Sequence, residues 1–394
     1  VMKASAVVFF LVATLVVFAG HFYIWARLVQ APGWPLPWTI AGTVLIVCLA
    51  LLLPTSMMLV RALPRGWAGP LGWIAFTWMG MGFLFTVSLF AIDVARWLGL
   101  GVASAWAWVA SSNGPADPVR REILARGAAG AATMLAAGTG VVALRGGLGE
   151  VDVKEVPVKL DRLPRELSGY TIVQLTDVHI GPLIGRRFID QVVEKVNGLR
   201  PDAVVITGDL VDGSVEELAR HAEPLARLAS RDGVYFVTGN HEYYSGVERW
   251  LPYLERMGIR VLRNERTSLG DAGASFDLAG IDDEWASRYG RGHGADLAKA
   301  VAGRDPEREL VLLAHQPKAI LGGAQAGVGL QISGHTHGGQ IWPFTGLVHL
   351  AQPYVAGLHR HDEATQIYVS RGTGFWGPPM RLGAPAEVTK IVLA

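Results

Sequence analysis

The sequence predicts a membrane-spanning bundle of four or five helices followed by a layered α/β domain. Residues 1–150 contain 13 Asp, Glu, Lys or Arg side chains, about 9% of that stretch, whereas residues 151–394 contain 56, about 23%. Soluble domains usually carry roughly 25% charged residues, so only the second part has such a composition. Within that part, short β-rich runs alternate with amphipathic helical patterns, which is typical of α/β folds.

Several apolar runs are long enough to cross the roughly 30 Å hydrocarbon core of a bilayer. They are residues 4–26, 38–60, 71–92 and 124–144. Residues 97–110 are also apolar but number only 14, so they leave the choice between four and five spans open. Nine of the 13 Trp precede residue 110, as expected for rings at membrane interfaces.

The number of spans determines the side of the membrane on which the α/β domain lies. With five spans, the positive-inside rule places Lys3, Arg61, Arg65, Arg120 and Arg121 in the cytoplasm. The α/β domain is then extracytoplasmic, which is our expectation for this multi-pass protein. With four spans, either the pair Arg120 and Arg121 or the N-terminal end lies outside the cytoplasm.

The composition excludes several classes of protein. The apolar runs exclude a wholly soluble enzyme. A disulfide-stapled secreted scaffold is excluded because Cys48 is the only cysteine. The formal net charge is +1 and no basic run is present, so nucleic acid is not an expected partner. The sequence leaves the oligomeric state open.

We expect three regions along the chain. Residues 1–147 form the transmembrane helical domain, residues 148–168 a linker and the first edge of the next domain, and residues 169–394 the α/β domain. Strands are predicted at residues 170–175, 203–207, 234–237, 310–314, 330–333, 366–370 and 388–393. Helical patterns lie at residues 186–197 and 215–229.

Polar residues that can bind metals follow five of the predicted strands. The motifs are Thr176-Asp177-Val178-His179, Gly208-Asp209-Leu210-Val211-Asp212, Gly239-Asn240-His241-Glu242, Ala314-His315 and Gly334-His335-Thr336-His337-Gly338. Ligands of α/β sheets bind at the carboxyl ends of strands. One such motif alone is typical of a turn, but five in succession indicate a metal site.

This order of motifs resembles the calcineurin-like metallophosphoesterase superfamily over about residues 165–393. The resemblance implies a four-layer α/β/β/α sandwich that binds two divalent metal ions. The membrane domain, Gly338-Gly339-Gln340 and Arg371-Gly372-Thr373-Gly374 resemble a membrane-associated bacterial branch, which implies an inner-membrane location.

Carried over residue by residue, the resemblance implies seven metal ligands. Asp177, His179, Asp209 and His337 would hold one ion, and Asp209, Asn240, His315 and His335 the other. The implied catalytic residues are His241, Asn240 and Asp209, and His241 would stabilise the transition state or protonate the leaving oxygen. Mixed oxygen and imidazole donors favour Mn²⁺ as the first expectation, with Fe, Zn²⁺ or Mg²⁺ as alternatives.

Residues near these motifs have less specific predictions. Asp212 and Glu242 are expected to orient ligands or shape turns, and Asp282 and Asp283 to belong to a turn. The apolar loop Phe375, Trp376, Pro378, Pro379 and Met380 is expected to pack in the core. The alternative is that this loop faces the bilayer or binds an acyl chain, with Arg381 on a phosphate.

Together these features indicate a membrane-bound dinuclear-metal phosphoesterase. It would hydrolyse a phosphoester or pyrophosphate by attack of a metal-activated hydroxide. Several spans exceed what an anchor requires, so the expected partners are the lipid bilayer and a phosphorylated, lipid-linked or envelope substrate. One alternative is a UDP-diacylglucosamine-type pyrophosphate hydrolase facing the cytoplasm, and another is a non-catalytic membrane receptor or scaffold.

Overall fold

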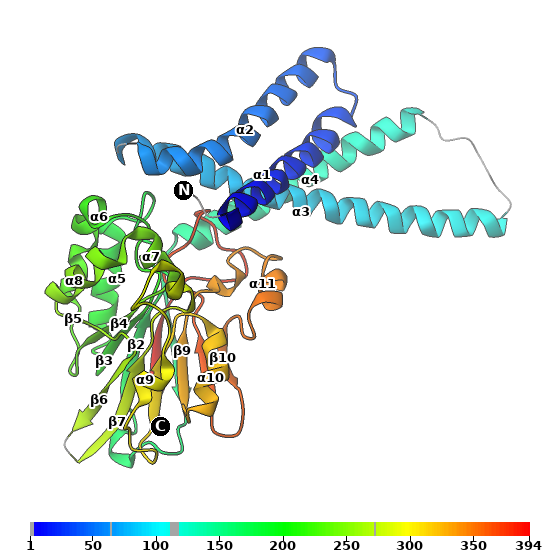
Figure 1. The fold of residues 1–394 in the computed structure, drawn as a ribbon. Coiled ribbons are helices and arrows are strands. Elements are labelled where there is room, and N and C mark those ends of the chain that lie inside the picture. Colours follow the sequence, from blue (N-terminus) through cyan, green and yellow to red (C-terminus); the bar gives the residue numbers. More distant parts are fainter. Residues whose placement is uncertain (1–3, 64, 111–117, 272) are drawn as a thin grey trace. The chain divides into compact units, whose positions relative to one another are not determined.

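The computed structural model describes residues 4–63, 65–110, 118–271 and 273–394 (Figure 1). They form two compact units. The first comprises the chain up to Leu144 together with Gly377–Pro379, and the second comprises Arg145–Trp376 and Met380–Ala394.

Four long apolar helices form in the described part of the first 148 residues. They are α1 (Ala4–Trp25), α2 (Leu36–Ala62), α3 (Arg65–Ala110) and α4 (Pro118–Leu148), with a π-helical turn at Ala26–Gln30 after α1. Each contains a stretch long and apolar enough to cross a membrane. Residues 71–92 and 97–110 belong to one continuous helix, α3, so the five-helix alternative is wrong for the described residues and the four-helix one holds.

Pairing of polar groups explains why α3 continues past its charged residues. Asp93 is buried, forms an ion pair with Arg27 at 2.9 Å, and accepts a hydrogen bond of 2.6 Å from the Tyr23 hydroxyl. His21 Nε2 lies 2.8 Å from Trp78 Nε1, which donates to it. Ionisable groups at membrane depth are costly unless they pair with one another. Charges that predicted the end of a helix therefore lie within a continuous one.

The second unit contains two six-stranded sheets, with strand orders β1-β12-β2-β3-β4-β5 and β10-β11-β9-β8-β7-β6. The first sheet comprises β1 (Asp152–Val158), β2 (Thr171–Leu175), β3 (Ala203–Thr207), β4 (Val234–Val237), β5 (Ile259–Val261) and β12 (Glu387–Leu393). The second comprises β6 (Glu265–Asp271), β7 (Ala274–Gly280), β8 (Leu310–Leu313), β9 (Leu330–Ser333), β10 (Gly357–Arg360) and β11 (Gln366–Val369). Strands β2, β3 and β4 are parallel neighbours, as are β8 and β9.

Helices cover the outer face of each sheet (Figure 1). They are α5 (Arg186–Gly198), α6 (Val215–Ala222), α7 (Asn240–Ser245), α8 (Val247–Arg256), α9 (Leu297–Val301) and α10 (Ile320–Gln325), whereas α11 (Thr345–Ala351) has no buried residue and covers neither sheet. Alternate residues of each strand face opposite sides. In β2, Val173 packs in the cluster that includes α5, α6 and α8, whereas Ile172 packs between the sheets with Leu278. On the second sheet, Leu312 packs with Ala300 of α9. The domain is therefore the four-layer α/β/β/α sandwich that the resemblance implied.

All seven predicted strands form, with ends shifted by at most one residue. Both helical patterns form as well, although the second changes to a 3₁₀ turn, Glu223–Arg227, after α6. The sequence did not predict β1, β5, β6, β7 and β10. Four of these five lie at the edges of the two sheets, where strands are partly exposed and lack a buried apolar run.

Packing between the sheets should govern the stability of the second unit. Leu278→Ala removes a fully buried side chain and should lower the free energy of unfolding by about 2–5 kcal/mol. Leu321→Ala, a matched change at an exposed leucine of α10, should alter it by less than about 0.5 kcal/mol. Thermal unfolding of the two purified full-length variants measures the difference, and equal midpoints would contradict this account of the core.

Candidate metal centre

The five motif-bearing strands end at the same edge of the sandwich. Parallel neighbours in one sheet deliver their carboxyl ends together, so β2, β3 and β4 bring in one group of loops and β8 and β9 another. Hydrogen bonds join the two groups. His315 Nδ1 lies 2.8 Å from the carbonyl oxygen of Thr207, and Gln174 Nε2 donates to the carbonyl oxygen of Ser333 at 2.9 Å.

Asp177, His179 and His337 form one buried cluster of possible ligands, with one ligand atom of each lying within 4.8 Å of the others. The Nε2 atoms of His179 and His337 are 3.0 Å apart, and His337 Nε2 is 3.4 Å from Asp177 Oδ1. The backbone N–H of His335 donates to both carboxylate oxygens of Asp177, each at 3.0 Å. The last motif is thereby joined to the first.

Asp209, His315 and His335 form a second cluster of the same kind. His315 Nε2 lies 3.1 Å from Asp209 Oδ2 and 3.2 Å from His335 Nδ1. The backbone N–H of His241 donates to Asp209 Oδ1 at 2.9 Å, which places α7 and its first residue, Asn240, beside this cluster. Asn240 Oδ1 is buried and has no hydrogen-bond partner among the described residues.

These residues fit divalent cations. Buried polar atoms normally have hydrogen-bond partners. Asn240 Oδ1 has none among the described residues, so its lone pairs are available to bind a cation. Ligating imidazoles usually donate their second N–H to a carboxylate or a carbonyl. His179 Nδ1 lies 3.1 Å from Asp212 Oδ2, and His315 Nδ1 faces the Thr207 carbonyl, which leaves both Nε2 atoms directed at the clusters. Carboxylate, amide and imidazole donors together suit Mn²⁺, Fe or Zn²⁺.

The backbone of the ligand-bearing loops is unusual. Five of the predicted ligands have positive φ angles between 50° and 71°: Asp177, His179, Asp209, His335 and His337. Such angles are rare for residues other than glycine, and they cluster at functional sites where the surrounding structure enforces them. The loops also approach one another closely, since a Cβ atom at Gly334 would lie 2.2 Å from Asp177 Oδ2.

The buried charges shift the pKa values of the site. Burial raises the pKa of a carboxylic acid, but the imidazoles of His315 and His241 outweigh it and hold the pKa of Asp209 well below its usual range. Burial and the neighbouring His315 lower the pKa of His335 to about 3. Burial, together with His179, also holds the pKa of His337 well below its usual range. Both rings are therefore neutral near pH 7 and keep lone pairs for a cation.

Two acidic residues support the clusters without joining the predicted ligand set. The Asp212 carboxylate contacts His179 Nδ1 with one oxygen and His241 Nδ1 with the other, the latter at 2.5 Å. Glu242 accepts hydrogen bonds from the backbone N–H groups of Asp209, Leu210 and Gly239, at 2.7 to 3.0 Å. These positions agree with the orienting and turn-shaping roles expected for both residues.

His241 stands beside two aromatic rings that the sequence did not assign to the site. The ring centroids of Tyr244 and Trp376 lie 5.2 and 6.0 Å from that of His241. Tyr244 follows His241 by three residues on α7. This spacing puts both side chains on one helix face, so the sequence contained a signal that Tyr244 lies at the site. Trp376 belongs to a distant loop, so no local signal indicated its position. Burial disfavours the charged imidazole, but Asp209 and Asp212 outweigh it and raise the pKa of His241 to about 9.

Other residues considered from the sequence do not belong to the clusters, although Arg381 contacts one of their members, with its Nη2 3.3 Å from His337 Nδ1. Asp282 pairs with Arg263 at 2.6 Å, and Asp283 caps a 3₁₀ turn by accepting from the N–H of Trp285. Phe375 and Met380 are buried, as core packing predicts, whereas Trp376 is exposed. The buried Arg381 guanidinium donates to the carbonyl oxygens of Gly374 and Ala384, so it is not free to hold a phosphate.

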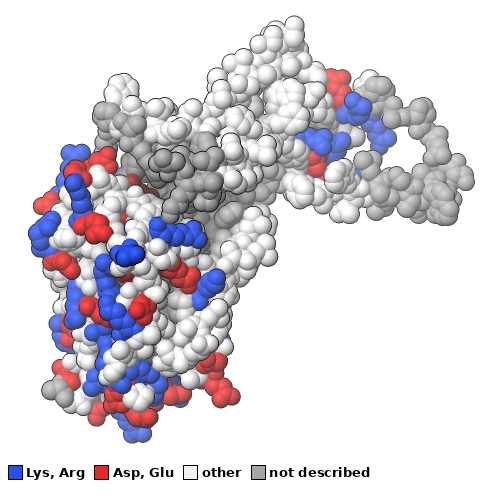
Figure 2. Space-filling view, in the orientation of Figure 1, with Lys and Arg blue, Asp and Glu red and all other residues white. Residues whose placement is uncertain are grey.

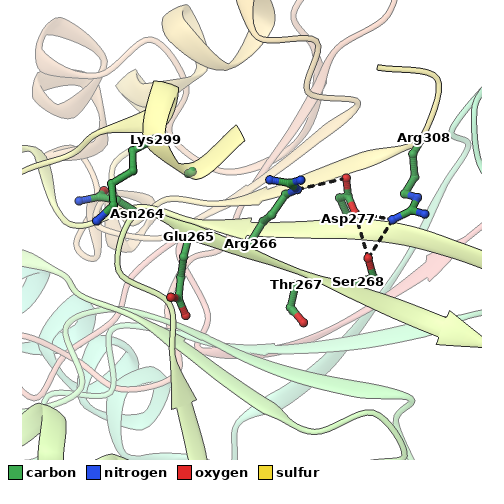
Figure 3. A pocket seen from close by; sticks show the side chains of 9 residues that line it. Asn264, Glu265, Arg266, Thr267, Ser268, Asp277, Lys299 and Arg308 are labelled. Carbon is green, nitrogen blue, oxygen red and sulfur yellow. Dashed lines mark hydrogen bonds and ion pairs between the residues drawn. The ribbon is translucent and has the colours of Figure 1, made fainter. Parts of the chain in front are cut away.

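A cavity of about 460 Å³ lies elsewhere in the second unit, along β6 and β7 (Figure 3). It is lined by Asn264, Glu265, Arg266, Thr267, Ser268, Asp277, Lys299, Ala300 and Arg308. No predicted ligand lines it. Figure 3 shows Arg266 and Arg308 directed at Asp277, which lies 3.6 and 3.1 Å from them. Two of its cations are thus already paired, and the convergent strand edge is the stronger candidate site.

A sandwich with oxygen and imidazole donors gathered at its carboxyl edge defines a class of protein that binds divalent metals. The calcineurin-like phosphoesterase family matches residues 170–339. A metallophosphoesterase of Aquifex aeolicus is 33% identical over 243 residues, which cover 61% of this chain and 91% of the relative. The chain belongs to the calcineurin-like phosphoesterase family, whose members depend on two metal ions.

Other relatives are more similar but longer. A metallophosphoesterase of Helicobacter pylori strain 26695 is 44% identical over 248 residues, covering 63% of this chain and 65% of the relative. A transmembrane protein with a metallophosphoesterase domain from Danio rerio is 44% identical over 249 residues, covering 61% of this chain and 57% of the relative. The chain thus matches less than two thirds of the length of these relatives. Together with the four apolar helices, the likeness supports a membrane protein.

Asp212 should control metal affinity, although it is not itself a predicted ligand. Asp212→Asn keeps the shape of the side chain but removes the charge that holds His179 and His241, and should weaken metal binding about 10- to 100-fold. Titration of the metal-free full-length protein with Mn²⁺, followed by calorimetry, measures this change. Asp362→Asn, at an acidic residue of a surface turn, is the matched control. Equal affinities in both variants would contradict the orienting role.

Proposed function

We propose that this protein is a membrane-bound, metal-dependent phosphoesterase that hydrolyses a phosphoester or pyrophosphate of a lipid-linked or envelope substrate. The observation that carries the proposal is the convergence of seven oxygen and imidazole donors with His241 at one edge of the sandwich. Family membership supports the same chemistry. A receptor or scaffold without activity would not need to keep all of these side chains together.

Each predicted ligand has a distinct task in this proposal. Asp177, His179 and His337 hold one cation, Asn240, His315 and His335 hold the other, and Asp209 contributes to both. When bound, a pair of divalent cations lowers the pKa of water and neutralises phosphate oxygens. Burial keeps the imidazoles of His335 and His337 neutral, and Asp212 and the Thr207 carbonyl orient those of His179 and His315.

His241 is proposed to act on the substrate rather than to bind a cation. Its Nδ1 is held by Asp212, and its Nε2 lies 3.9 Å from Asp209 Oδ2, outside hydrogen-bond distance. Its ring is partly exposed, unlike the buried His315. A positioned imidazole with a free Nε2 can donate a proton to a leaving oxygen or stabilise negative charge on the phosphate.

Substitutions should separate catalysis from metal binding. His241→Ala should retain both metal ions but lose about 100-fold or more of turnover, because it removes a proton donor and no ligand. Asp209→Asn should reduce the metal content itself, since it weakens the proposed shared ligand. Metal analysis of purified protein and hydrolysis of bis(p-nitrophenyl) phosphate measure the two effects. Full activity of the His241 variant would contradict its role, and a full complement of metal in the Asp209 variant would contradict the shared-ligand assignment.

The membrane-spanning part supports a substrate that the membrane presents. One helix already anchors a protein effectively irreversibly, yet the described residues form four helices that can span. Membrane lipids incubated with the Mn²⁺-loaded protein should therefore lose one phosphorylated species, identified by mass spectrometry. The His241→Ala variant is the control. Activity on soluble phosphoesters with no depleted lipid would contradict the lipid-linked substrate and leave the phosphoesterase activity in place.

We further propose that the catalytic domain is extracytoplasmic. With four spans, one side of the membrane receives Arg27, Arg96, Arg120, Arg121 and Arg126, and the side of the domain receives Lys3, Arg61, Arg65 and Arg145. The first side carries more positive charge close to the spans, which favours a cytoplasmic location for it. A reporter fused after Ala394 tests the orientation: periplasmic alkaline phosphatase activity is expected. Activity of a cytoplasmic reporter instead would favour the cytoplasm-facing pyrophosphate hydrolase.

A further inference from the structure

An exposed apolar surface lies on the segment that follows the last ligand motif. We call it the α11 surface and define it by Trp342, Phe344, Leu347 and Leu350, whose exposed fractions are 61, 48, 57 and 84%. No residue of α11 is buried. Soluble proteins seldom expose several large apolar side chains together unless they form an interaction site.

The α11 surface also lacks charge. Residues 340–358 contain no Asp, Glu, Lys or Arg, although about 23% of residues 151–394 are of these types. Figure 2 shows charged side chains spread over much of the second unit, while the region where α11 lies in Figure 1 is uncharged. Two of the four Trp of residues 151–394, Trp342 and Trp376, belong to this region. Trp is enriched where proteins meet the membrane–water interface.

Hydrogen bonds tie this surface to the metal centre. Gln340 accepts from the backbone N–H of Trp376 and donates to its carbonyl oxygen, both at 3.0 Å. Thr345, the first residue of α11, donates to the carbonyl oxygen of Gly338 at 3.1 Å. Trp376 in turn lies beside His241. The α11 surface therefore continues directly into the rim of the candidate active site.

The length of the connecting chain restricts how far the domain can be from a membrane. The spanning helix α4 ends at Leu148 and β1 begins at Asp152, so only three residues separate them. Even fully extended, the four Cα–Cα steps from Leu148 to Asp152 span roughly 14 Å, at about 3.5 Å per step. A domain held so close to a bilayer can bring an apolar surface to it.

From these observations we propose that the α11 surface inserts into the interfacial layer of the lipid bilayer, at the level of the headgroups and the first acyl carbons. A short apolar helix flanked by Trp is suited to that layer. The α11 surface then brings lipid phosphates to the side of His241. Only the delivery of lipid phosphates to His241 rests on the proposed function, because insertion into lipid does not require turnover.

The experiment places a fluorescent probe on the surface of the full-length protein. In a Cys48→Ser background, Leu350→Cys is labelled with an environment-sensitive nitrobenzoxadiazole dye and reconstituted into phosphatidylethanolamine–phosphatidylglycerol vesicles. Leu321→Cys is the matched control, since Leu321 is also an exposed leucine on a short helix of the same domain but lies outside the α11 surface. Nitroxide-labelled lipids then quench any dye that lies within the bilayer.

Insertion predicts a blue-shifted emission at position 350 and quenching by nitroxide lipids roughly twofold or more stronger than at position 321. Equal, water-like emission at both positions overturns the proposal. A blue shift at position 350 without lipid quenching also overturns it, because protein, either the spanning helices or a second copy, then covers the surface. None of these fluorescence readouts depends on hydrolytic activity. Failure of the proposed function can therefore be distinguished from failure of membrane insertion.

Discussion

Two buried carboxylates, Asp177 and Asp209, impose the constraint on which the second unit depends. A buried carboxylate costs several kcal/mol unless charges and hydrogen bonds compensate it. Asp177 accepts from the backbone N–H of His335 and the hydroxyl of Thr176, and Asp209 contacts His315. These contacts come from four different loops. The two sheets must therefore meet at one edge for either carboxylate to be tolerated, and divalent cations would complete the compensation.

The sequence was sufficient to predict that the proposed ligands lie close together, because each of them lies within a few residues of the end of a buried strand. Parallel strands present their carboxyl ends at one edge, so local motifs translate into a shared site without knowledge of the tertiary packing. The neighbours of His241 show where this reasoning ends. Tyr244 shares a helix face with His241, so its position could have been predicted from the sequence. Trp376 reaches His241 only through tertiary contacts of a loop held by Gln340.

The fold was predictable to the same degree and for related reasons. Buried central strands such as β3 and β8 carry apolar runs that identify them, whereas edge strands such as β1 and β10 are partly exposed and lack such a run. In the apolar helices, charge suggested a break near Asp93 that does not occur. Sequence patterns cannot reveal that Asp93 pairs with Tyr23 of α1 and with Arg27 of the π-helical turn that follows it, contacts that compensate the charge within α3.

The last motif serves two purposes that its sequence alone does not separate. His335 and His337 direct donors into the clusters, whereas Gly338, Gly339 and Gln340 attach the following segment to the same loop. A Cβ atom at Gly339 would lie 2.4 Å from the Cα atom of Thr345, so the start of α11 packs directly on the ligand-bearing loop. An apolar surface connected in this way cannot shift without moving the two histidines. Contact of that surface with lipid would therefore fix the position of the metal centre relative to the bilayer, which a flexible tether could not do.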